Sequence, residues 1–262
     1  MKPPASNQIH DGGVRPAPAD PNSKGNGTLV TAKASLRCCG FWRCFNEPMN
    51  ESSVMDPLLL GAVPLEFRAD ANAALRALAC PHHPTMSRLI QDTNGRSPSP
   101  IKIHISGELV QIPCRTYYEW PEVSRTQNLG PEQLLILAAW MSRHGDGRIR
   151  QAALRDLLEA NASWTIPFVV QLCGEYVIEI GNDLKQFFGT TLAERPELQQ
   201  AYVQFTKENP AFISLTVQRA LSYWNAYDRW RFHRDQYPQI AALNSLRALT
   251  NPFLVSSTRP EP

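Results

Sequence analysis

The chain has 262 residues, of which 43% are hydrophobic and 19% charged, and its formal net charge at pH 7 is +2. This length allows one large domain or two small ones, and the composition is typical of a globular protein with an ordinary core. Basic and acidic side chains are balanced in both halves of the chain. The balance argues against a protein that binds nucleic acid or anionic membranes through charge alone.

The sequence predicts a cytoplasmic protein without a membrane span. Its apolar runs all fall short of the about 20 residues that a helix needs to cross a bilayer. The first residues, MKPPASNQIHDGG, lack the apolar segment of a secretory signal. The six cysteines are irregularly spaced, which fits a reducing compartment better than a disulfide framework.

Residues 1–57 are rich in Pro, Gly, Ser and Asn and show no helical or strand period, so we expect a disordered N-terminal arm. The composition changes near Met55. This shift suggests the hypothesis that translation begins at Met49 or Met55.

Cysteine and histidine residues in this part of the chain offer a zinc site as an alternative. The residues concerned are Cys38, Cys39, Cys44, Cys80, His82 and His83. Their spacing fits none of the regular zinc patterns, and half of them lie in the arm. We therefore predict no metal site.

Residues 58–100 are expected to form a short helix, over Glu66 to Ala79, followed by a linker with several turn signals. Residues 101–112 then alternate between apolar and polar side chains around Ser106-Gly107. This period of two predicts a β-hairpin that ends at Pro113. An isolated hairpin is marginally stable in water, so it should pack on the helical domain, with Tyr117, Tyr118 and Trp120 as the contact residues.

From Gly130 onward the chain has helical periodicity. A helix opened by Pro131 should end at Ser142 to His144, and a second helix should follow it. Pro167 is expected to open a third helix that runs to Phe187 and is apolar enough to lie at the centre. The remaining expected helices cover Pro196 to Lys207, Ala211 to Arg234 and Gln239 to Leu249, before a flexible tail over residues 251–262.

The predicted fold class is therefore mainly α, an irregular helical bundle with one small β-hairpin. The expected domain organisation is an arm (1–57), a short helix and linker (58–100), a hairpin with a helical domain (101–250) and the tail.

The start of the second of these helices resembles HEAT-type repeats. Asp146, Ile149, Arg150 and Ala153 occupy the places of the family's capping acid, β-branched residue, arginine and small residue. The resemblance implies a packed helix pair over about residues 131–188. No second copy follows at the repeat period of about 40 residues, so we expect one pair inside a bundle and not a solenoid. The stretch is also similar to bacterial proteins with an RH-x-DG-x-[VI]R turn and a [GE]EYV-x-EI helix, which implies no activity.

A polar junction is the first candidate site, and its members are His144, Asp146, Arg148, Arg150, Glu175 and Glu179. A histidine beside an aspartate can act as a base or a metal ligand. The structural alternative is that His144 complements the end of the first helix while Asp146 caps the second.

Glu175 and Glu179 lie four residues apart, which predicts that both carboxylates project from one face of the third helix. Di-metal bundles need Glu-x-x-His elements, and the sequence contains none. An ion pair from one of these glutamates to Arg148 or Arg150 is the expected arrangement.

An aromatic and arginine-rich run is the second candidate site. The residues proposed for an interaction surface are Arg219, Tyr223, Trp224, Tyr227, Arg229, Trp230, Arg231 and Arg234. Arginine interleaved with aromatic rings is typical of protein hot spots and of base stacking. The alternative is a core helix, in which Val217, Leu221, Trp224 and Tyr227 form one buried face.

The sequence carries no P-loop, dinucleotide-binding glycine pattern, nucleophile elbow or zinc-protease motif. We predict no catalytic residue and no cofactor. The expected function is a non-enzymatic module or scaffold that binds another protein, through the aromatic run or the hairpin edge. The alternatives are an enzyme with its site at the His144 turn and, less favoured, a protein associated with nucleic acid.

Overall fold

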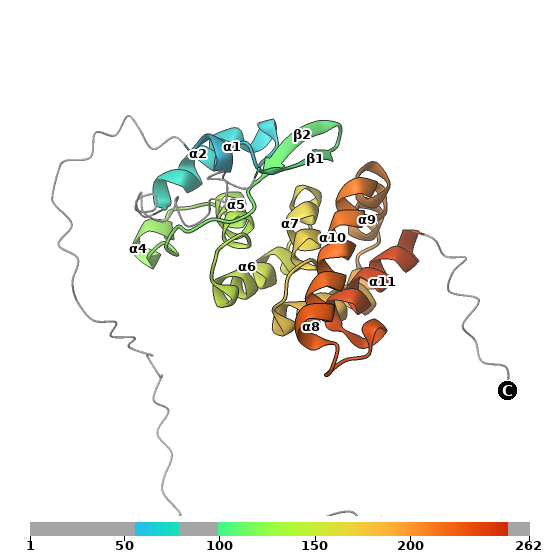
Figure 1. The fold of residues 1–262 in the computed structure, drawn as a ribbon. Helices are drawn as coiled ribbons and strands as arrows, with labels where there is room; N and C mark the ends of the chain where they lie inside the picture. The colour runs from blue at the N-terminus through green and yellow to red at the C-terminus, as the bar shows by residue number, and fades with distance from the viewer. Residues whose placement is uncertain (1–55, 79–98, 251–262) are drawn as a thin grey trace, which may run out of the picture. The chain divides into compact units, whose positions relative to one another are not determined.

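The structure is a computed structural model that describes residues 56–78 and 99–250 (Figure 1). Most of the predicted arm, both alternative start methionines, the zinc alternative and the C-terminal tail lie outside the described residues. The described residues belong to one unit of the chain, Asn50–Pro262. The expected domain boundaries remain predictions.

The described part of the chain is mainly α-helical with one two-stranded sheet, which confirms the predicted fold class. The helices are α1 (Pro57–Leu60), α2 (Arg68–Ala77), α4 (Val123–Thr126), α5 (Pro131–Met141), α6 (Gly147–Glu159), α7 (Ile166–Leu172), α8 (Ile178–Gly189), α9 (Pro196–Glu208), α10 (Pro210–Tyr223) and α11 (Pro238–Thr250). Proline is the first residue of five of them and the second residue of α7, because proline suits the first helical turn, where no backbone donor is needed.

The hairpin is formed by β1 (Ile101–Ile105) and β2 (Glu108–Ile112), as the alternating pattern predicts. Ser106 and Gly107 both have positive φ, 51° and 84°, which suits a tight hairpin turn. Ile103 and Val110 face each other across the ladder and are buried in the core. The hairpin therefore packs on the helices and does not stand alone.

Both outer edges of the hairpin already have partners. Asn209, between α9 and α10, accepts a hydrogen bond from the His104 N–H at 2.8 Å and donates one to the His104 carbonyl at 2.9 Å. On the other edge, the Gln111 N–H donates to the Gly61 carbonyl at 2.9 Å. Because these backbone groups are already bonded, the hairpin edge is a poor candidate for strand addition by a partner.

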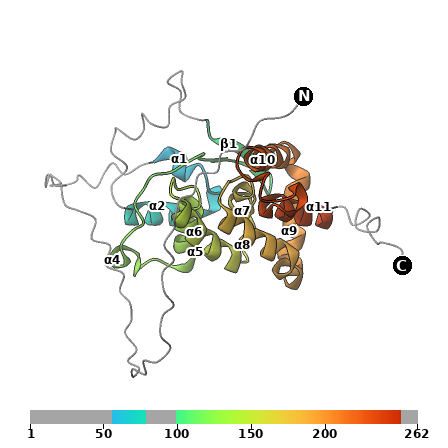
Figure 2. The ribbon, with the colours of Figure 1, turned by 60° about the horizontal axis from the view of Figure 1, so that its bottom comes forward.

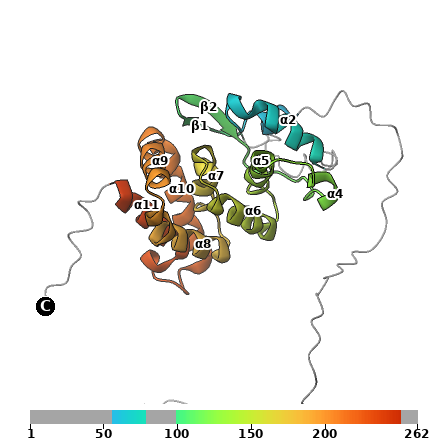
Figure 3. The same ribbon diagram turned by 180° about the vertical axis from the view of Figure 1, so that it is seen from behind.

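Helix α7 lies between the α5–α6 pair and helices α9, α10 and α11 (Figures 2 and 3). All of its residues are buried, so the apolar stretch is central, as expected. The predicted third helix does not continue to Phe187, however. It breaks at Cys173 to Val177, and α8 starts in a new direction.

Two local features explain the break. The N–H groups of Cys173, Gly174 and Glu175 each donate to a carbonyl three residues earlier, which tightens and ends the last turn of α7. A Cβ on Gly174 would lie 3.3 Å from the Cβ of Arg219, so α10 passes close to the turn. The break overturns the prediction that Glu175 and Glu179 share one helix face.

Helices α5 and α6 pack against each other, and α5 also contacts α2. Ala153 of α6 is fully buried at this contact, as expected for the small residue of the pair. The HEAT-like resemblance itself remains a prediction. Across the described ranges, no helix has the length and hydropathy of a membrane span.

Candidate functional site

The junction between α5 and α6 is built as the sequence suggests. Asp146 caps α6, since its Oδ1 accepts a hydrogen bond from the Arg148 N–H at 2.8 Å. The Nδ1 atom of His144 accepts one from the Asp146 N–H at 2.9 Å. This bond makes Nδ1 an acceptor, so the ring proton of a neutral His144 sits on Nε2.

The segment after the hairpin fastens this junction from the other side. The Thr116 N–H donates to the Arg143 carbonyl at 2.9 Å, and the Gly145 N–H donates to the Thr116 carbonyl at 3.0 Å. A Cβ on Gly145 would come within 2.7 Å of the Tyr117 ring, so only glycine allows this close approach. The junction is therefore fixed by contacts more than twenty residues apart in the chain.

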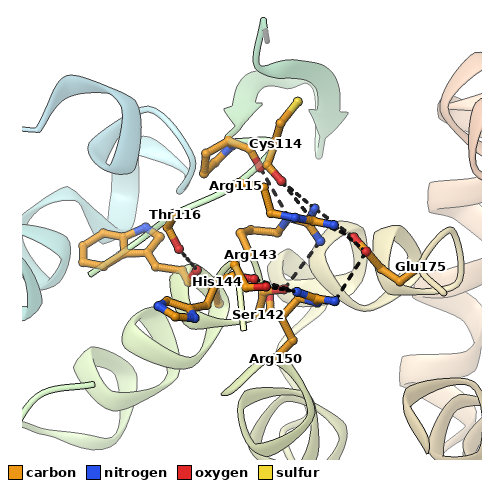
Figure 4. Close-up of polar contacts among 12 residues, drawn as sticks. Cys114, Arg115, Thr116, Ser142, Arg143, His144, Arg150 and Glu175 are labelled. Carbon is orange, nitrogen blue, oxygen red and sulfur yellow. Dashed lines mark hydrogen bonds and ion pairs between the residues drawn. The ribbon is translucent and has the colours of Figure 1, made fainter. Parts of the chain in front are cut away.

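Three arginines converge on the buried carboxylate of Glu175 (Figure 4). Arg115 binds both of its oxygens, at 2.7 and 2.5 Å. Arg143 donates to Oε1 at 3.3 Å, and Nη2 of Arg150 lies 3.7 Å from Oε2. We call Arg115, Arg143, Arg150 and Glu175 the arginine cluster.

Backbone carbonyls accept further hydrogen bonds from the arginine cluster. Arg143 donates to the carbonyls of Pro113 and Cys114. Arg150 donates through Nη1 to the carbonyls of His144 and Gly145, both at 2.9 Å. The carbonyls of His144 and Gly145 follow α5, and the C-terminal end of a helix favours positive charge. Arg150 thus donates hydrogen bonds to two carbonyls and forms an ion pair with Glu175.

The cluster holds its charges firmly at neutral pH. Burial by itself would raise the pKa of Glu175, but the hydrogen bonds from Arg115 and the charges of all three arginines outweigh burial and lower it. Burial lowers the pKa of Arg143 to about 10, which leaves that guanidinium protonated. A carboxylate saturated with donors and held at a low pKa is a poor general base.

The arrangement therefore acts as a structural clamp. It ties the post-hairpin segment, the α5–α6 junction and the α7–α8 turn to one buried charge. No group of three or more His, Cys, Asp or Glu side chains within residues 56–78 and 99–250 could hold a metal ion. The expected ion pair from Glu175 to Arg150 is present, whereas Arg148 and Glu179 are exposed outside the cluster.

The aromatic run does not form one long helix. Helix α10 ends at Tyr223, and Trp224–Asp228 forms a π-helical turn. The wider π turn changes the phase of the side chains, so Tyr227 leaves the buried face on which the sequence places it. Trp224 still packs against the core, and its indole N–H donates to the Phe232 carbonyl at 3.0 Å.

Four aromatic side chains lie one after another along the surface. We call them the aromatic strip, and they are Tyr176, Tyr223, Tyr227 and Trp230. Ring centroids are 5.5 Å apart for Tyr176 and Tyr223, and 6.2 Å apart for the stacked pair Tyr223 and Tyr227. The Trp230 indole N–H donates to the Tyr227 carbonyl at 2.8 Å. Tyr176, Tyr227 and Trp230 are 48%, 62% and 82% exposed.

The arginine cluster and the aromatic strip are neighbours, which the sequence does not reveal. The Arg150 guanidinium carbon lies 5.9 Å from the centroid of the Tyr176 ring. The Cβ of Arg219 in α10 lies close to Gly174, the residue before Glu175. The two separately predicted candidate sites thus meet at the α7–α8 turn.

Of the remaining predicted surface residues, Arg219 lies at the near end of the strip and Arg229, Arg231 and Arg234 lie at the far end. Arg229, Arg231 and Arg234 are exposed, Arg219 and Tyr223 are half-buried, and Arg234 pairs with Asp235 at 3.2 Å. Sequence reasoning did not single out Arg115, Arg143 and Tyr176 as site residues. Arg143 stands at the end of an apolar helix and Arg115 after a strand, and neither position signals a shared carboxylate.

Comparison with known proteins adds no family to this description. No protein-family model, no curated protein and no solved structure matches the chain.

Proposed function

We propose that the protein is a non-enzymatic helical interaction module that binds a protein partner through the aromatic strip. The observation that carries the proposal is the exposure of two large aromatic side chains. Trp230 is 82% exposed and Tyr227 is 62% exposed. Large exposed aromatic side chains with neighbouring arginines are typical of the residues that dominate protein interfaces. The cytoplasm is the proposed location, on the sequence grounds given above.

The strip is already arranged for binding. Tyr223 and Tyr227 stack with an interplanar angle of 21°, and the Trp230 indole is tethered to the backbone of its own turn. Aromatic rings with few rotatable bonds, fixed before binding, lose little entropy when a partner arrives. A partner therefore gains apolar contact without having to order this surface.

The remainder of the fold suits a scaffold. The α5–α6 pair, taken as HEAT-like, is locked by the arginine cluster to the turn that carries Tyr176. Since Glu175 is saturated with donors, the same cluster lacks the poised base that an enzyme at the His144 turn would need.

The test is affinity capture with the full chain and a Tyr227→Ala, Trp230→Ala double variant. We expect the wild type to recover one protein at constant stoichiometry and the double variant to lose it. The matched control is Trp120→Ala, because Trp120 is also an exposed tryptophan but lies in the segment before α4. A monomer without any stoichiometric partner, or a partner that the double variant retains, would contradict the proposal.

A further inference from the structure

We propose that the aromatic strip receives an acidic protein segment, whose carboxylates pair with Arg219, Arg229 and Arg231 while its apolar side chains contact the rings. This inference rests on the proposed function and names the chemistry of the partner. The inference rests on charge complementarity, because positive charge lies at both ends of the strip.

At the near end of the strip, the arginine cluster leaves an excess of positive charge. Three guanidinium groups share one carboxylate, so the ion pairs of Glu175 neutralise a single positive charge. Nε and Nη2 of the fully buried Arg150 find no hydrogen-bond partner among the described residues. This charge lies behind Tyr176 and is poorly screened by water.

Arg219 brings a second positive group to the same end. It packs against Gly174 beside the cluster, and the ion pairs within residues 56–78 and 99–250 do not include it. Arg115 is the most exposed member of the cluster, at 24%, but its terminal nitrogens already bind Glu175 and the Cys114 carbonyl. Arg219 is therefore the half-buried arginine at this end that has no ion pair with a described residue, and it is the one we expect to meet a partner carboxylate.

At the far end, Arg229 and Arg231 flank Trp230 and are exposed. Neither takes part in an ion pair with another described residue. Of the two acids nearby in the chain, Asp235 is engaged by Arg234 and Asp228 is half-buried. Guanidinium groups bind carboxylates through two parallel hydrogen bonds, so each free arginine favours an acidic side chain opposite it.

The rings between the two ends exclude a purely electrostatic ligand. The ring centroids of Tyr176, Tyr223 and Tyr227 follow one another at 5.5 and 6.2 Å and form an apolar contact surface. A segment that alternates acidic and apolar side chains matches this order of charge, rings and charge. A nucleic-acid backbone is a poorer match, because it requires a continuous row of phosphate contacts and the chain as a whole has a net charge of only +2.

The experiment selects a random-peptide phage library on the full chain and tests each enriched clone for loss of binding on the Tyr227→Ala, Trp230→Ala variant. We expect clones that depend on these rings to be enriched in Asp and Glu together with apolar residues. Their affinity should fall about tenfold or more on an Arg229→Glu, Arg231→Glu variant and should weaken as salt rises. Both arginines are exposed, so this variant should fold.

The matched control is Arg76→Glu with Arg125→Glu, which changes the net charge equally on the exposed faces of α2 and α4. Equal losses in both charge variants would overturn the inference, as would ring-dependent clones without acidic enrichment. Those two results leave the interaction module standing. The absence of any ring-dependent clone would overturn both proposals, and tighter binding of a single-stranded oligo(dT) at physiological salt would replace the peptide with nucleic acid.

Discussion

The arginine cluster and the aromatic strip use similar residues in opposite ways. In the cluster, Arg143 and Arg150 are buried, donate hydrogen bonds to backbone carbonyls and form ion pairs with Glu175. In the strip, Arg229 and Arg231 stand beside Trp230 in solvent. Tyr176 belongs to both regions, because its ring lies over Arg150 and against Tyr223.

The difference shows how burial separates structure from recognition. Buried charge is costly unless it is paired, and the ion pairs of the cluster with Glu175 hold three segments together. Exposed aromatic rings contribute little to the stability of the monomer and are available to a partner. Substitutions in the cluster should therefore change stability, and those at the exposed end of the strip should change binding alone.

The largest expected effect is that of Glu175→Gln. The substitution leaves three guanidinium groups, two of them buried, without their common counter-charge. Removing one partner of a buried ion pair costs about 3–5 kcal/mol, and we expect a loss of that size in the free energy of unfolding. Urea unfolding followed by far-UV circular dichroism measures it.

Glu179→Gln is the matched control, since Glu179 is an exposed glutamate in the first turn of α8. Its loss should cost less than about 1 kcal/mol, the usual value of an acid at a helix N-terminus. Equal effects of the two substitutions would mean that the cluster does not hold the junction.

The stability difference between wild type and Glu175→Gln should also depend on pH. The pKa of Glu175 is lower in the folded protein than its ordinary value of 4.5. A carboxyl group with a depressed folded pKa stabilises the protein above its unfolded pKa and loses that contribution as pH falls through the folded pKa. The difference should be full at neutral pH and narrow below about pH 4.5. A difference that stays constant down to pH 3 would contradict this assignment.

A smaller loss is expected for Arg115→Lys. The guanidinium of Arg115 binds both oxygens of Glu175, and an ammonium group cannot reproduce that fork. The positive charge remains, so we expect a loss of about 1.5–3 kcal/mol, the size of one hydrogen bond to a charged group. Arg148→Lys, at an exposed arginine of the same junction, should leave the midpoint of urea unfolding unchanged.

Local signals in the sequence predict most of the elements. The period of two at Ile101 to Ile105 identifies the hairpin, and Pro131, Asp146 and Pro196 mark helix starts, because each signal acts within a few residues. The break between α7 and α8 has no such signal. It depends on a buried ion cluster and on the approach of α10, both of which join residues far apart in the chain.

The candidate site was likewise predictable only where local signals in the sequence determine it. The cap at Asp146 and the role of Arg150 follow from local pattern. The meeting of Arg115, Arg143 and Glu175 does not, because nothing in the sequence between positions 115 and 175 indicates their contact. The π turn at Trp224 likewise hides which rings of the aromatic run face solvent.

The smallest effect on stability should come from Trp230→Ala, although tryptophan is the largest side chain in the strip. Trp230 is 82% exposed, and its indole bonds only the Tyr227 carbonyl of the same turn among the described residues. Substitutions at such positions usually change the free energy of unfolding by less than about 0.5 kcal/mol. Thermal and urea unfolding should therefore coincide with those of the wild type.

The neighbouring tryptophan Trp224 sharpens this last prediction. It is half-buried against the core and its indole donates to the Phe232 carbonyl, so Trp224→Ala should destabilise the protein by about 3 kcal/mol. If Trp230→Ala were equally destabilising, the exposed strip would itself be part of the structural framework. The contrast between a buried network that holds the fold and an exposed surface that meets a partner would then fail.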